Sequence, residues 1–148
     1  MNIYFICTGN TCRSPMAEAI LRSKGMEHVT VRSAGIHAGD GWPISANAKT
    51  LIEEGQFPYT AVSRAVSSEE LQWADLVLTM TESHKAALLY AYPEMEQKIF
   101  TLKGYVQPSA SGDVHDPYGG DLATYRQTFD ELTRIIDMLA QRLMEGQA

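Results

Sequence analysis

Cys7-Thr8-Gly9-Asn10-Thr11-Cys12-Arg13-Ser14-Pro15 is the stretch of sequence around which the fold is predicted to form. The apolar run before it, residues 3–6, is typical of a buried strand. Ser14 followed by Pro15 is typical of the start of a helix, with a capping residue and then a proline at the first helical position. We therefore expect a short polar loop between the carboxyl end of a strand and the N-terminus of a helix.

Such a loop is suited to bind a tetrahedral oxyanion. Its main-chain N–H groups converge on one point, and the free amides of the helix start add partial positive charge there. Five residues separate Cys7 from Arg13, a C-x(5)-R spacing that lets the loop curl around a phosphate with the thiol beneath it. The guanidinium of Arg13 can then bind two phosphate oxygens. The residues expected to contact phosphate through the loop are Thr8, Gly9, Asn10, Thr11 and Cys12.

Cys7 is the candidate nucleophile. A thiol beside a helix N-terminus and an arginine is expected to have a pKa below its ordinary value of about 8.5, and the thiolate is the reactive form. Ser14 can donate its hydroxyl to that thiolate when a phosphocysteine is hydrolysed, and Asn10 is expected to brace the loop through hydrogen bonds to the main chain. The alternative is a buried structural cysteine at the end of a strand, which is the commoner fate of a lone thiol.

Length and charge restrict the class of protein. The 148 residues suit one domain, 1–148, and the formal charge of −6 argues against nucleic-acid or anionic-membrane partners. No apolar run has the length of a membrane span, and because residues 1–2 lead directly into the first strand, we expect no signal peptide. With only two cysteines, a disulfide framework is excluded, and we expect a cytoplasmic protein.

No metal or organic cofactor is expected. Cys7 and Cys12 lack a second pair of ligands, and the histidines have no zinc-like spacing. We interpret all four histidines as surface or loop residues, namely His28, His37, His84 and His115. Of these, His115 is of most interest. Cys12 has two interpretations, packing inside the loop or a resolving thiol that bridges to Cys7 on oxidation.

Apolar runs alternate with helical patterns along the rest of the chain. Strands are expected at 3–6, 29–35, 76–78 and 99–102, and helices at 14–23, 44–54, 67–73, 81–90 and 122–143. In the last helix, apolar residues recur at three- and four-residue steps from Leu122 through Phe129 to Leu143. This alternation predicts an α/β fold of three α/β/α layers with a parallel sheet, whose ligand site lies beyond the carboxyl ends of the strands.

A long loop is expected between the fourth strand and the last helix. It ends in Gly112-Asp113-Val114-His115-Asp116-Pro117-Tyr118-Gly119-Gly120-Asp121 and leaves the same sheet edge as the Cys7 loop. Asp116 is the candidate general acid, stiffened by Pro117, with Tyr118 as a wall of the cleft. Asp121 is expected to cap the last helix and Asp113 to turn the chain. For Trp42, core and cleft positions are both open.

Cys7 to Glu18, together with Asp116-Pro117-Tyr118, resembles the low-molecular-weight protein tyrosine phosphatases. The resemblance covers nearly the whole chain and implies a four-stranded parallel sheet in the order 2-1-3-4. It implies that Cys7 is the nucleophile, Arg13 the phosphate clamp and Asp116 the general acid, with Ser14 as the partner of the thiolate and Asn10 as the loop brace. It also implies reversible oxidation at Cys12.

Two positions depart from the tyrosine-directed pattern and resemble the protein-arginine-phosphatase branch. Thr11 stands where an isoleucine or leucine is usual, and Gly119 where a second aromatic often follows Tyr118. An apolar side chain suits a phenyl ring but would desolvate guanidinium N–H donors. A threonine hydroxyl can accept a hydrogen bond from those donors, and Tyr118 can stack on their plane. The alternative is that Thr11 is merely tolerated in the loop.

The expected activity is hydrolysis of phosphoarginine in proteins through a phosphocysteine, by a monomer. A tyrosine phosphatase is the alternative enzyme, and a phosphoryl carrier or a phosphoprotein-binding module is the non-enzymatic one. An arsenate reductase of this fold is disfavoured because no cysteine follows Cys12. A carrier is disfavoured because its phosphocysteine must survive until transfer, whereas Arg13 and Asp116 favour hydrolysis.

Overall fold

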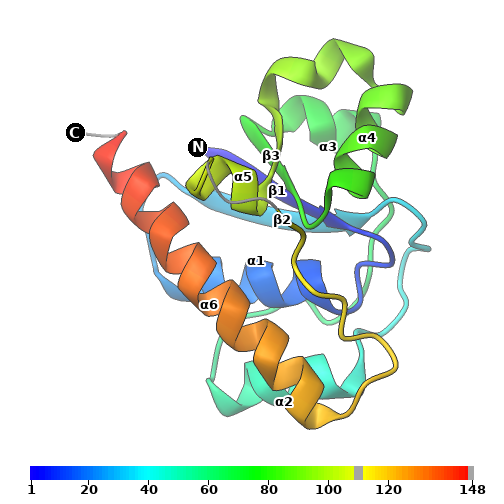
Figure 1. The fold of residues 1–148 in the computed structure, drawn as a ribbon, viewed down its shortest axis with the longest axis vertical. Helices are drawn as coiled ribbons and strands as arrows, with labels where there is room; N and C mark the ends of the chain where they lie inside the picture. Colours follow the sequence, from blue (N-terminus) through cyan, green and yellow to red (C-terminus); the bar gives the residue numbers. More distant parts are fainter. Residues whose placement is uncertain (109–111, 147–148) are drawn as a thin grey trace.

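A parallel sheet of four strands forms the centre of the computed structural model, which describes residues 1–108 and 112–146 (Figure 1). The strands are β1 (Asn2–Cys7), β2 (Thr30–Gly35), β3 (Leu76–Thr79) and β4 (Ile99–Thr101). They pair in the order β2-β1-β3-β4, with Cys7 opposite Gly35 and Ile6 opposite Thr79. The predicted parallel sheet and its order 2-1-3-4 are confirmed.

Six α-helices and a 3-10 helix surround this sheet in the described part of the chain. They are α1 (Arg13–Ser23), α2 (Ala46–Glu54), α3 (Ser68–Trp73), α4 (Glu82–Ala91), η1 (Pro93–Lys98), α5 (Leu102–Val106) and α6 (Leu122–Glu145). A side-chain oxygen caps five of the helices by accepting a hydrogen bond from a main-chain N–H of the first turn, which stabilises a helix by about 1 kcal/mol. The capping residues are Ser45, Ser67, Thr81, Thr101 and Asp121, so the predicted cap at Asp121 is confirmed.

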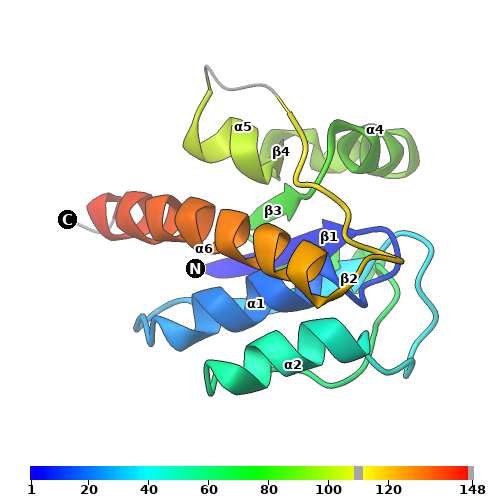
Figure 2. The same cartoon turned by 60° about the horizontal axis from the view of Figure 1, so that its bottom comes forward.

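The helices cover both faces of the sheet, which confirms the predicted three layers. Helices α1, α2 and α6 lie on one face (Figure 2), and α3 and α4 pack together on the other (Figure 1). Successive residues of β1 supply the two cores, because side chains alternate across a strand. Ile3 and Phe5 join the core under α1 and α6, and Tyr4 and Ile6 join the core under α3 and α4. All four are fully buried.

The prediction that Ser14 caps the first helix is wrong. Helix α1 begins at Arg13, and Cys12 occupies the capping position without a side-chain hydrogen bond to the helix. Ser14 lies inside the first turn and is fully buried. Its hydroxyl is hydrogen-bonded to Cys7 and Asn10, so it does not cap the helix. Pro15 is still accommodated, since the first turn of a helix needs no N–H bond there.

The predicted strand 99–102 is one residue too long, and the loop after it is shorter than expected. The hydroxyl of Thr101 accepts a hydrogen bond from the N–H of Gly104, 3.0 Å away, and this cap begins α5. The part of the predicted loop at 109–111 lies outside the described residues. In α6, Leu122 is exposed and Phe129 only partly buried, whereas Thr128 and Ile135 face the core.

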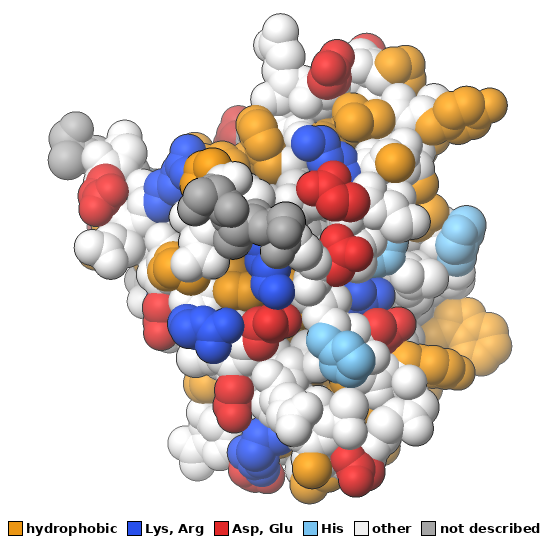
Figure 3. Space-filling model, in the orientation of Figure 1, with side chains coloured by type: hydrophobic (Ala, Val, Ile, Leu, Met, Phe, Trp, Pro, Cys, Tyr) orange, Lys and Arg blue, Asp and Glu red, His pale blue; other side chains and the backbone are white. Residues whose placement is uncertain are grey.

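Charged side chains of both signs are interspersed on the face of the molecule shown in Figure 3. Within residues 1–108 and 112–146, no helix combines the length and the apolar character needed to cross a membrane.

Candidate active site

The loop after β1 lies against the end of β2, where the backbones approach very closely. A Cβ atom at Gly35 would lie 2.5 Å from the carbonyl oxygen of Thr8 and 2.8 Å from the N of Asn10. Neither backbone atom can withdraw without opening the loop, so this position requires glycine. The N–H of His37 also donates to the Thr8 carbonyl, at 2.9 Å, and holds the loop on the sheet edge.

The sulfur of Cys7 lies under this loop among polar groups. Its Sγ is 2.8 Å from the hydroxyl oxygen of Ser14 and 3.3 Å from the N–H nitrogen of Asn10. The residue is only 3% exposed, and this burial raises the pKa of the Cys7 thiol, while Ser14, the charge of Arg13 and the Asn10 N–H act to lower it. The structure thus differs from the predicted lowered pKa, because desolvation of the buried thiol is the larger effect.

A buried hydrogen-bonded network extends from this sulfur to the opposite side of the loop. Asn10, in a left-handed conformation with φ of 55°, donates through Nδ2 to the hydroxyls of Ser14 and Ser33, at 2.8 and 2.9 Å. Its Oδ1 accepts from the N–H of Arg64. Ser33 in turn donates to Oε1 of Glu18 at 2.6 Å. Sequence reasoning missed both Ser33 and Glu18. Ser33 lies in β2, far from the loop motif in the chain, and Glu18 lies on α1, the helix that follows the motif.

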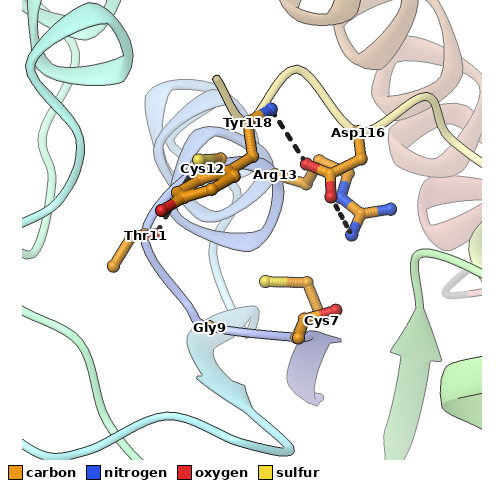
Figure 4. A pocket seen from close by; sticks show the side chains of 8 residues that line it. Cys7, Gly9, Thr11, Cys12, Arg13, Asp116 and Tyr118 are labelled. Carbon is orange, nitrogen blue, oxygen red and sulfur yellow. Dashed lines mark hydrogen bonds and ion pairs between the residues drawn. The ribbon is translucent and has the colours of Figure 1, made fainter. Parts of the chain in front are cut away.

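The loop forms the floor of a cavity of about 270 Å³ at the carboxyl end of the sheet. Figure 4 shows Cys7 at its base and Asp116 and Tyr118 on the segment above it. No acceptor within the described residues pairs with the main-chain N–H groups of Gly9, Thr11 and Cys12, so they are available to a ligand. The cavity is lined by Cys7, Thr8, Gly9, Thr11, Cys12, Arg13, Asp116 and Tyr118.

Arg13 joins the loop to the segment that carries Asp116. Its guanidinium donates to the carbonyl of Val114 at 3.1 Å and lies 3.6 Å from Oδ2 of Asp116. The Arg13 side chain is 6% exposed, whereas that of Asp116 is 52% exposed. Oδ1 of Asp116 accepts from the N–H of Tyr118 at 3.1 Å, which fixes the carboxyl over the cavity (Figure 4). Arg13, the predicted phosphate clamp, and Asp116, the predicted general acid, therefore lie in contact, with the Arg13 guanidinium directed toward the Asp116 carboxyl.

Trp42 and Tyr118 both lie at the surface, beside the cavity. Trp42 is 65% exposed, so the core position left open for it is wrong. It borders a second hollow of about 400 Å³ that shares Gly9, Thr11 and Tyr118 with the first. Gly119, where a second aromatic often stands in the tyrosine-directed pattern, has φ of +82°, a conformation that favours glycine.

Cys12 is turned away from the sheet edge toward α6. Its Sγ lies 3.2 Å from the hydroxyl of Tyr125 and 3.7 Å from that of Ser45. Both cysteines are free thiols, so the bridge between Cys7 and Cys12 stays a prediction. Within the described ranges, no three His, Cys, Asp or Glu side chains are grouped to hold a metal ion.

His84 is a further site residue that sequence reasoning missed, and its interpretation as a surface or loop residue is wrong. It lies in the first turn of α4, is 7% exposed, and its Nε2 is 2.7 Å from the hydroxyl oxygen of Thr8. Burial and the charge of Arg13 lower the pKa of His84 to about 4. The predicted cap at Thr81 places the start of this helix at the same sheet edge as the loop, but no local pattern pairs His84 with Thr8. His115, by contrast, is exposed.

Comparison with known proteins places these features in a wider group. The family described as low molecular weight phosphotyrosine protein phosphatase matches residues 2–148. A protein-arginine-phosphatase of Geobacillus stearothermophilus is 43% identical, covering 98% of this chain and 97% of its own. The low molecular weight protein-tyrosine-phosphatase PtpB of Staphylococcus haemolyticus is 42% identical, covering 94% and 97%. A solved arginine phosphatase mutant with a phosphorylated active-site serine superposes with a TM-score of 0.93 at 41% identity, covering 97% and 96%.

Proposed function

Because the chain belongs to the low molecular weight phosphotyrosine protein phosphatase family and is a protein phosphatase, we propose that it hydrolyses phosphoarginine in proteins through a phosphocysteine on Cys7. The observation that carries the proposal is a thiol buried beneath available loop amides, with one carboxyl above it in the same cavity. The relative at 43% identity is named a protein-arginine-phosphatase, which supports the same substrate.

The first step is transfer of the phosphoryl group to sulfur. The thiolate of Cys7 attacks phosphorus in line while the loop amides and Arg13 stabilise the charge on the equatorial oxygens. The P–N bond breaks, and the protonated carboxyl of Asp116 gives its proton to the departing nitrogen. In the second step the Asp116 carboxylate takes a proton from water, which attacks phosphorus, and Cys7 leaves as a thiolate stabilised by Ser14. The phosphorylated serine of the solved relative is consistent with transfer to this position.

Thr11 and Tyr118 support a guanidinium leaving group rather than a phenol. Both line the cavity that holds Cys7 and Asp116. The Thr11 hydroxyl, at the cavity wall, supplies an acceptor for the N–H donors of the substrate guanidinium. The exposed ring of Tyr118 supplies a face on which the planar guanidinium stacks. The exposed carboxyl of Asp116 accepts from the guanidinium before it gives up its proton.

Phosphotyrosine is the second candidate substrate, because a relative at 42% identity is named a protein-tyrosine-phosphatase. The aromatic side chains of Trp42 and Tyr118 beside the cavity also suit a phenyl ring. Both substrates fit the same covalent mechanism, so specificity is the question that experiment decides.

The test compares two peptides of one sequence, one with phosphoarginine and one with phosphotyrosine, by release of inorganic phosphate. We expect a higher kcat/KM for phosphoarginine, a shift toward phosphotyrosine in Thr11→Ile, and no turnover of either peptide by Cys7→Ser. A strong preference of the unmodified protein for phosphotyrosine would overturn the assignment of the substrate. Substantial turnover by Cys7→Ser would overturn the covalent route.

A further inference from the structure

Thr8 follows the candidate nucleophile directly and carries a hydroxyl to which the mechanism above gives no role. Thr8 is exposed and lines the cavity over Cys7. Its carbonyl is fixed by the N–H of His37, and its Oγ1 lies 2.7 Å from Nε2 of His84. His84, in the first turn of α4, therefore holds the side chain of Thr8 in the loop after β1.

The buried imidazole of His84 limits how this hydrogen bond is shared. Its other nitrogen, Nδ1, is buried and has no hydrogen-bond partner within the described residues. If Nδ1 carried the proton, an N–H donor would be buried unpaired, and such orphaned donors are rarer than unpaired acceptors. The favoured tautomer therefore carries its proton on Nε2 and donates to the oxygen of Thr8.

This direction of donation determines where the Thr8 proton points. A threonine hydroxyl has one O–H donor and two acceptor lone pairs. With a lone pair occupied by His84, the O–H turns away from the imidazole, and the open side of Thr8 is the cavity. A phosphoryl dianion offers only acceptors, so the hydroxyl matches it.

We propose that His84 is a positioning residue that, as its Nε2–H tautomer, holds Thr8 so that the Thr8 hydroxyl donates a hydrogen bond to a phosphoryl oxygen of the substrate. The proposal rests on the proposed function only in that the ligand carries a phosphoryl group, whichever amino acid bears it. Titration of His84 plays no part at neutral pH, because its pKa lies near 4. The charged and titratable groups that act on it are Arg13, Asp113, Asp116 and His37.

The first experiment observes the tautomer directly. Nitrogen-15 NMR correlation spectra of the labelled protein at pH 7 distinguish a protonated Nε2 from a protonated Nδ1, and His84→Gln assigns the signals. We expect the Nε2–H form. Observation of the Nδ1–H form would overturn the proposal, whatever the substrate of the enzyme is.

The second experiment measures kinetics on the better of the two phosphopeptides. Thr8→Val and His84→Leu are each expected to lower kcat about tenfold or more, the size of effect for a hydrogen bond to a charged group. Thr8→Ser retains the hydroxyl and His84→Gln retains an amide donor, so both are expected to keep kcat within about threefold of the unmodified protein. Ser83→Ala, an exposed neighbour on α4, is the matched control and is expected to be unaffected.

The double variant Thr8→Val with His84→Leu decides whether the two residues act together. We expect it to lose no more activity than Thr8→Val alone, because His84 acts only through the Thr8 hydroxyl. Multiplicative losses, or full activity of Thr8→Val, would overturn the proposal. If the unmodified protein hydrolyses neither peptide, its affinity for inorganic phosphate is measured by calorimetry in place of turnover. Equal phosphate affinity of the unmodified protein and Thr8→Val would then overturn the proposal. A phosphotyrosine preference would overturn the substrate assignment alone.

Discussion

Glu18 provides a sharp test of the network beneath the phosphate loop. It is 4% exposed, and its carboxylate accepts from Ser33 at 2.6 Å, from Thr60 at 2.8 Å and from Arg22 at 3.2 Å. In Glu18→Gln the shape is retained, but one acceptor oxygen becomes an amide donor. Whichever way that amide turns, it faces at least one O–H or N–H group that has lost its acceptor.

The cost can be worked out from these contacts. Losing one buried hydrogen bond to a charged group costs about 1.5–3 kcal/mol. The Arg22 side chain is 36% exposed, so solvent screening keeps its ion pair below about 1 kcal/mol. Together these give a fall of about 2–3 kcal/mol in the free energy of unfolding, or about 5–10 °C in Tm for a chain of this size. Turnover is expected to fall too, because Ser33 connects Glu18 to Asn10.

Urea and thermal unfolding followed by circular dichroism measure this change. Glu27→Gln is the matched control, since Glu27 is exposed and the substitution removes the same charge. We expect that control to stay within about 0.5 kcal/mol of the unmodified protein. Equal stability of Glu18→Gln and Glu27→Gln would refute the reasoning that this buried carboxylate supports the loop.

Three further changes test other parts of the site. Ser14→Ala removes a contact that lowers the pKa of Cys7, so the pH of half-maximal alkylation by iodoacetamide is expected to move upward, and a downward shift would contradict the assigned hydrogen bond. Gly35→Ala is expected to lower the free energy of unfolding by about 1–3 kcal/mol and to weaken phosphate binding, since its Cβ would meet the loop backbone; calorimetry with unchanged affinity would count against this. Asp116→Asn is expected to lower the rate constant of phosphoryl transfer from phosphoarginine about 10²–10⁴-fold in single-turnover assays, and a smaller loss would remove Asp116 from the role of acid.

The sheet and the loop motif follow from local patterns, and this explains why they could be predicted. Buried apolar runs, capping residues such as Ser67 and Thr81, and the Cys7 to Arg13 spacing each act over a few residues. The family resemblance supplied the order of strands, which no local pattern contains, and the structure confirms it.

What could not be predicted depends on contacts between distant segments. Ser14 is typical of a cap, but Asn10 and Cys7 compete for its hydroxyl, and this tertiary pairing prevails. The raised pKa of Cys7 depends on how completely the loop covers the sulfur. His84 is 76 residues away from Thr8 in the sequence, so no spacing rule connects them.

The ion pair between Arg13 and Asp116 means that a phosphate binding to Arg13 competes with the carboxylate of Asp116 for the guanidinium. The guanidinium already has this internal anion 3.6 Å away. The net electrostatic gain is smaller than for an unpaired arginine, for the ester or amidate and for free phosphate alike. We therefore expect a lower affinity for inorganic phosphate than an unpaired arginine would give.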